Sequence, residues 1–83
     1  MIRIKSIKPF ASSQGAGGNW ATVTVTFDTT YPDPDKLLIL VNGAECNYGD
    51  HAISYKINSI TKTSATIGTY NINKIYGYIV ELY

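Results

Sequence analysis

The stretch that decides the fold is residues 20–27, which read Trp-Ala-Thr-Val-Thr-Val-Thr-Phe. Apolar and polar side chains alternate along it, so that Val23, Val25 and Phe27 share one face and the threonines share the other. Alternation with a period of two is typical of a β-strand with one buried face. We therefore expect a strand with a threonine-lined outer face, and Trp20 stands at the start of that outer face.

Five further segments have the pattern of strands and are separated by turn-forming residues. The run 37–41 is apolar on both faces, which is typical of a fully buried strand, and Asn42-Gly43 predicts a turn after it. Residues 9–19 form a loop rich in Gly and Ser, and 71–74 form the last turn. The expected strands cover residues 1–8, 20–27, 37–41, 52–60, 65–70 and 75–83. The strands 52–60 and 65–70 form a hairpin that is joined by a connection at 61–64.

The composition supports the same fold class. The strand-forming residues Ile, Val, Thr, Tyr, Phe and Trp make up 34 of the 83 residues. Six short strands at close spacing in a chain of 9.1 kDa predict an all-β fold, a small antiparallel β-sandwich that forms a single domain over residues 1–83.

The last expected strand is apolar on both faces. One face carries Tyr76, Tyr78, Val80 and Leu82. The other carries Ile75, Ile79 and Tyr83. Only one face of a strand enters the core of a small sandwich, and an exposed apolar face often marks a contact with another subunit. We therefore expect an oligomer interface at Ile75, Ile79 and Tyr83.

Charge and cysteine content exclude several function classes. Seven basic and six acidic residues leave a net charge of +1, and the lysines are dispersed, so the chain has no basic field for nucleic acid. One cysteine and one histidine exclude an internal disulfide and a Cys/His zinc cluster. We also expect neither a signal peptide nor membrane insertion, because the longest apolar run covers only 37–41.

Candidate catalytic and metal-binding residues form no convincing pattern. Cys46 and His51 share a loop, but nucleophilic catalysis also needs an orienting group, and the adjacent Asp50 is poorly placed for that role. The loop carboxylates could gather one hard cation, but solvated loop side chains explain them better. We expect no enzyme, no metal and no cofactor. The carboxylates concerned are Asp28, Asp33, Asp35, Glu45 and Asp50.

Aromatic side chains at strand ends and in loops favour recognition of a surface ligand. Tyr and Trp offer large, rigid contacts at a low entropic cost, and Asn and Asp beside them donate and accept hydrogen bonds. This combination suits a sugar ring, whose C–H groups lie on an aromatic face while its hydroxyls meet polar groups. The alternative is that these are ordinary strand-end aromatics, half buried by their neighbours. The candidate ligand-binding residues are Trp20, Asn47, Tyr48, Asp50, His51, Tyr70 and Asn71.

The order of several motifs resembles the receptor-binding tip domains of bacteriophage tail fibres and the related H-type lectins. The strand 21–26 leads into Phe27-Asp28-Thr29-Thr30-Tyr31-Pro32, then come the strand at 37–42, the hairpin at 55–67 and the closing strand at 76–82. This chain lacks the family's Trp near Glu81 and has Ser64-Ala65 in place of the hairpin's Gly-Phe. The family's sugar-binding residues cannot be matched to this sequence position by position and are not carried over. The resemblance implies a six-stranded sandwich, a homotrimer and binding to a host-surface saccharide.

Two functions from different classes follow. The first is a non-enzymatic, carbohydrate-binding receptor module at the tip of a phage tail fibre, located on the virion tail after assembly. The second is a structural, Ig-like or fibronectin-like accessory domain that mediates assembly and binds no small ligand.

Overall fold

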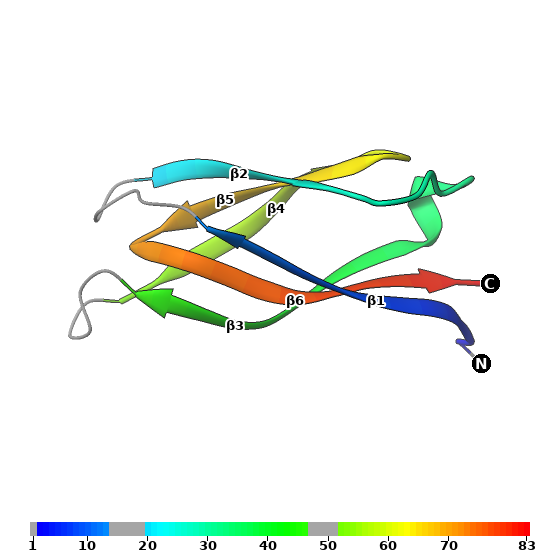
Figure 1. The fold of residues 1–83 in the computed structure, drawn as a ribbon, viewed down its shortest axis with the longest axis horizontal. Coiled ribbons are helices and arrows are strands. Elements are labelled where there is room, and N and C mark those ends of the chain that lie inside the picture. Colours follow the sequence, from blue (N-terminus) through cyan, green and yellow to red (C-terminus); the bar gives the residue numbers. More distant parts are fainter. Residues whose placement is uncertain (1, 14–19, 47–51) are drawn as a thin grey trace.

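The computed structural model describes residues 2–13, 20–46 and 52–83. This part of the chain forms six strands, with one short 3₁₀ turn, η1 (Pro34–Lys36), before the third strand (Figure 1). The strands are β1 (Ile4–Ser13), β2 (Trp20–Thr26), β3 (Leu37–Cys46), β4 (Ser54–Ile60), β5 (Ser64–Tyr70) and β6 (Ile72–Leu82).

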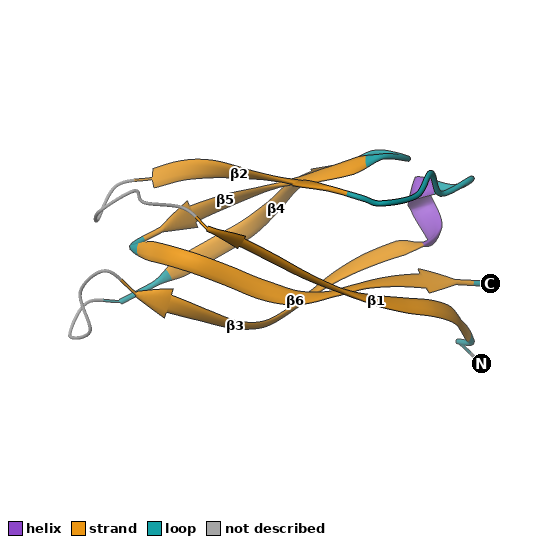
Figure 2. Cartoon of the chain, in the orientation of Figure 1, coloured by secondary structure: helices purple, strands orange, loops and turns teal. Residues whose placement is uncertain are grey.

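The strands form two antiparallel sheets of three strands each (Figure 2). In the first, called sheet A here, β6 lies between β1 and β3. In the second, called sheet B, β5 lies between β2 and β4. The two sheets are stacked as layers, so the expected all-β architecture with six strands in antiparallel sheets is confirmed.

The core lies between the layers. The alternation in residues 20–27 produces it directly, because Val23, Val25 and Phe27 are buried while Thr22 and Thr24 are exposed. Tyr31 lies edge-on against Phe27, with ring centroids 5.4 Å apart. Both central strands contribute fully buried side chains, so the core depends on them most. The buried core residues of β5 and β6 are Ala65, Ile67, Ile72, Ile75 and Ile79.

The predicted interface at Ile75 and Ile79 is therefore wrong, because both side chains lie inside this chain's own core. Alternation alone could not distinguish two apolar faces of β6. Gly77 lies on the Ile75 face and pairs with Phe10 on β1 and Val41 on β3, and a Cβ at this position would collide with the β3 backbone at Leu40 and Asn42, so the position admits no side chain. Tyr83 is exposed, and the Arg3 guanidinium lies 5.1 Å from the centroid of its ring.

The two edge strands of sheet A, β1 and β3, extend beyond their expected ends. β1 extends into the expected loop as far as Ser13. Its Pro9 is tolerated because β1 is an edge strand. β3 continues past the expected turn at Asn42-Gly43, where the register shifts between Val41 and Gly43 as in a β-bulge.

The run 37–41 is buried on one face only, which corrects the expectation of a fully buried strand. Leu37 is buried, whereas Leu38 and Leu40 are exposed on the outer face of sheet A. Among the described residues, nothing covers this face, because the second layer lies on the opposite side of the sheet.

Replacing Ile75 by Ala is expected to lower the free energy of unfolding by about 2–4 kcal/mol, because the substitution opens a cavity in the core. Ile2→Ala is the matched control, since Ile2 is largely exposed, and it should change stability by less than about 0.5 kcal/mol. Urea unfolding followed by circular dichroism measures both. Equal effects of the two substitutions would contradict the core position of Ile75.

Candidate functional site

An exposed aromatic pair stands at one end of sheet B. Trp20 and Tyr70 are directly paired across β2 and β5, so their side chains leave the sheet on the same face. Their ring centroids are 5.6 Å apart and the rings are tilted by 45°. Trp20 remains 58% exposed. The sequence predicted both residues as ligand contacts, and the structure brings these two together.

A shallow hollow lies beside this pair on the outer face of sheet B. In the next row of the sheet, Gly68 on β5 stands between Thr22 on β2 and Lys56 on β4. Gly68 has no side chain and lies buried at the floor beneath its neighbours, since a Cβ built there would lie 3.2 Å from Asn58 Nδ2 and 3.6 Å from Lys56 Cγ. The hollow has a volume of about 310 Å³. The residues that line it are Trp20, Ala21, Thr22, Lys56, Asn58 and Gly68.

The lining supplies two kinds of contact. The indole of Trp20 offers an apolar face, and the groups of Thr22, Lys56 and Asn58 offer a hydroxyl, an ammonium and an amide. An apolar surface with a few polar groups around it is the usual composition of a small-ligand site, and this volume is at the lower end of the range for such sites, about 300–1,000 Å³. The arrangement is suited to a ligand with one apolar face and several hydroxyls.

Sequence reasoning missed Thr22, Lys56, Asn58 and Gly68. Their proximity depends on the register of three strands, which alternation does not determine. The one available signal was Gly68, because a glycine in the interior of a strand often marks a place that something else approaches closely.

Asn71 has a structural position in place of the expected ligand contact. It is fully buried, and it forms the whole connection between β5 and β6 with a positive φ of 57°. Asn adopts this left-handed conformation more readily than most residues. Its side-chain Nδ2 donates a hydrogen bond of 3.4 Å to the carbonyl oxygen of Ala52. Asn71 therefore holds the start of the segment that leads into β4.

The other predicted ligand residues, Asn47, Tyr48, Asp50 and His51, lie outside the described residues. Strand β3, which ends at Cys46 just before them, ends on the side of the sandwich where β2 begins (Figure 1).

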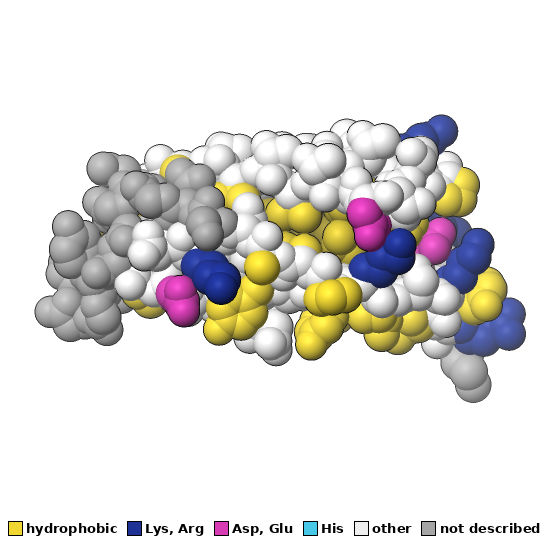
Figure 3. All heavy atoms as spheres, viewed as in Figure 1, with side chains coloured by type: hydrophobic (Ala, Val, Ile, Leu, Met, Phe, Trp, Pro, Cys, Tyr) yellow, Lys and Arg dark blue, Asp and Glu magenta, His cyan; other side chains and the backbone are white. Residues whose placement is uncertain are grey.

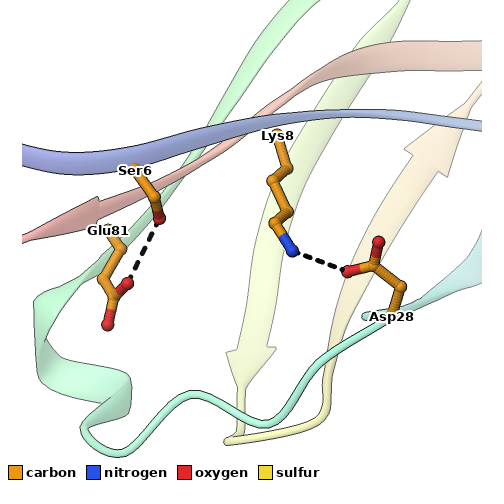
Figure 4. A network of polar contacts seen from close by, with 4 residues as sticks. All are labelled: Ser6, Lys8, Asp28 and Glu81. Carbon is orange, nitrogen blue, oxygen red and sulfur yellow. Dashed lines mark hydrogen bonds and ion pairs between the residues drawn. The ribbon is translucent and has the colours of Figure 1, made fainter.

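Several carboxylates considered for a cation have local partners. Lys8 Nζ on β1 lies 3.2 Å from Asp28 Oδ1, which follows β2, so this ion pair links the two sheets along one edge (Figure 4). Asp33 accepts a hydrogen bond of 3.0 Å from the backbone N–H of Asp35 at the start of η1. Within residues 2–13, 20–46 and 52–83, no three His, Cys, Asp or Glu side chains gather closely enough to hold a metal ion.

Cys46 is exposed, and its expected partner for nucleophilic catalysis, His51, is among the residues not described. In the described parts of the chain, no helix has the length and apolar character needed to cross a membrane.

No protein-family model, curated protein or solved structure matched this chain when compared with it. The assignment of function therefore depends on the geometry of the site.

The Asn71 turn gives a prediction that separates backbone strain from side-chain contacts. Asn71→Gly keeps the positive φ without strain and removes the side-chain hydrogen bond, whereas Asn71→Ala removes the bond and also strains the backbone by about 1 kcal/mol or more. We expect Asn71→Ala to unfold at a lower urea concentration than Asn71→Gly. An Ala variant as stable as the Gly variant would contradict this account of the turn.

Proposed function

We propose that this chain is a non-enzymatic carbohydrate-binding module that recognises a saccharide through the outer face of sheet B. The observation that carries the proposal is the exposure of Trp20, which stands beside Tyr70 and next to the hollow over Gly68. Trp is usually well buried in a folded protein, so a tryptophan that is more exposed than buried and lines a polar hollow favours a role in binding.

The site would hold a pyranose ring by dividing its two kinds of surface. The C–H groups of one ring face would pack on the indole of Trp20, and the hydroxyls would meet the Asn58 amide, the Lys56 ammonium and the Thr22 hydroxyl. Because the hollow is open and shallow, a single site would bind weakly. Several sites displayed together would raise the overall affinity by making later binding events intramolecular.

The resemblance to phage tail-fibre tip domains and H-type lectins supports a more specific form of this proposal. In that form, the chain is the homotrimeric tip of a tail fibre on the virion, and the ligand is a glycan of the host surface. A trimer would present three copies of the sheet B site, which suits the weak binding expected of each one.

One observation favours the second function, a structural accessory domain that mediates assembly without a small ligand. The outer face of sheet A exposes several large apolar side chains, which is typical of a protein contact. Binding to saccharides is the property that distinguishes the two functions.

A glycan array probed with a multivalent, fluorescently labelled form of the chain tests the proposal. We expect selective binding to a small set of saccharides. Trp20→Ala should weaken that binding at least tenfold, about 1.4 kcal/mol, because the apolar contact is lost. Gly68→Ala should weaken it as well, because the new methyl group lies on the floor of the hollow.

Thr24→Ala is the matched control, because Thr24 lies on the same face of β2 but outside the hollow, and it should bind as the wild type does. Circular dichroism of each variant confirms that it is folded. A blank array at high multivalency, or binding that Trp20→Ala leaves unchanged, would refute the sheet B site. The blank array would favour the accessory domain.

A further inference from the structure

The outer face of sheet A carries two complete rows of apolar residues. The register places Val80 of β6 between Ile7 of β1 and Leu38 of β3 in one row. In the next row, Tyr78 lies between Pro9 and Leu40.

The exposed members of these rows leave a broad apolar surface open. Ile7, Leu38, Leu40 and Tyr78 are each between 42% and 53% exposed. Val80 is buried although it faces outward, because its two neighbours in the row flank it on the adjacent strands.

The two outer faces of the sandwich differ in chemistry. The outer face of β2 in sheet B carries Thr22, Thr24 and Thr26, which suit contact with water. Figure 3 shows the same contrast, with hydrophobic side chains gathered along the layer of sheet A and a mostly uncoloured layer of sheet B. Apart from the aromatic pair Trp20 and Tyr70, the large exposed apolar side chains of the two outer faces therefore belong to sheet A.

The dimensions of the sheet A face match what a stable contact needs. With strands about 4.8 Å apart and a rise of about 3.3 Å per residue, three strands alongside the 11 residues of β6 cover about 500 Å². Two such faces, if packed over their whole length, would bury about 1,000 Å², which is the lower limit for a specific protein interface. Sheets also pack readily face to face, at a distance of about 10 Å.

We propose that the outer face of sheet A is the surface on which a second copy of this chain packs. The two apolar rows contain no charged side chain, and the charged pair on this face, Lys74 of β6 and Glu45 of β3, lies in a separate row nearer one end, where the two are directly opposite each other. The apolar rows therefore offer nothing to pair with a charged partner and meet no repulsion from an identical face. A face of this kind can pack on an identical face, as the two-fold contact of a dimer requires; this contact is distinct from the three-fold contacts of a homotrimer. The inference does not rest on saccharide binding, because the proposed binding site lies on the other sheet.

The mass in solution, measured by light scattering over a hundredfold range of concentration, tests this inference. We expect the wild-type chain to reach a mass of about twice 9.1 kDa as the concentration rises. Leu40→Lys places a charge in the centre of the face and should give a monomer. Ile7→Lys, on the edge strand β1, should do the same. Leu40→Thr, which keeps a strand-forming residue, should raise the concentration at half-assembly at least tenfold.

Thr24→Lys is the matched control, since it adds the same charge to the outer face of sheet B, and it should assemble as the wild type does. Circular dichroism shows which variants are folded. A wild-type chain that stays at 9.1 kDa throughout would overturn the inference and point to a different chain as the occupant. Folded Leu40→Lys and Ile7→Lys variants that keep the wild-type mass would also overturn it. Since the glycan array reports on sheet B, either proposal can fail while the other holds.

Discussion

The packing of two central strands, β5 and β6, across a single core is the constraint on which the rest of the structure depends. Each sheet is three strands wide, so only one strand in each has hydrogen-bonded neighbours on both sides. Among the described residues, those with no exposed surface, Ile67, Ile72 and Ile75 among them, are on these two strands or, in the case of Asn71, join them. A chain of 83 residues can bury only a modest part of its surface, and here the inner faces of two sheets account for that part.

Because the core uses only the inner faces, both outer faces remain available for other contacts. Their chemistry separates them: sheet B presents threonines, a glycine-floored hollow and an aromatic pair, whereas sheet A presents aliphatic and tyrosine side chains. The two faces point away from each other on opposite sides of the sandwich. If copies of the chain pack through sheet A, each sheet B face stays open to solution. Assembly and ligand binding would then not compete for surface.

The sequence predicted the elements whose two faces differ in polarity. β2 alternates strictly, so its inner and outer residues were identified correctly, and the hairpin of β4 and β5 was predicted to within two residues at each end. Its connection is closed by Thr61, whose Oγ1 accepts a hydrogen bond of 3.0 Å from the backbone N–H of Ser64. The faces of β6 could not be assigned in this way, because both are apolar and only the packing of the two sheets shows which one is covered.

The candidate site was predictable only in part, for a related reason. Exposed aromatics at strand ends can be recognised one at a time, and Trp20 and Tyr70 were. That they form a pair follows from a register spanning 50 residues of sequence, and the contribution of Lys56 and Asn58 follows from the pairing of a third strand. Alternation assigns each side chain to a face but not to a row. Residues that meet across strands therefore became visible only when the rows were known.

The failed expectation of full burial for β3 and the second apolar face of β6 carry the same information. β3 and β6 each have an apolar pattern on both faces, which is typical of strands that are covered on both sides. In the single chain only one side is covered, so Leu38, Leu40 and Tyr78 remain exposed where the sequence pattern predicts burial. A sequence adapted to water on that face would carry threonines there, as β2 does. The mismatch is resolved if the covered state of sheet A belongs to the assembled protein, with the second cover supplied by another copy of the same sheet.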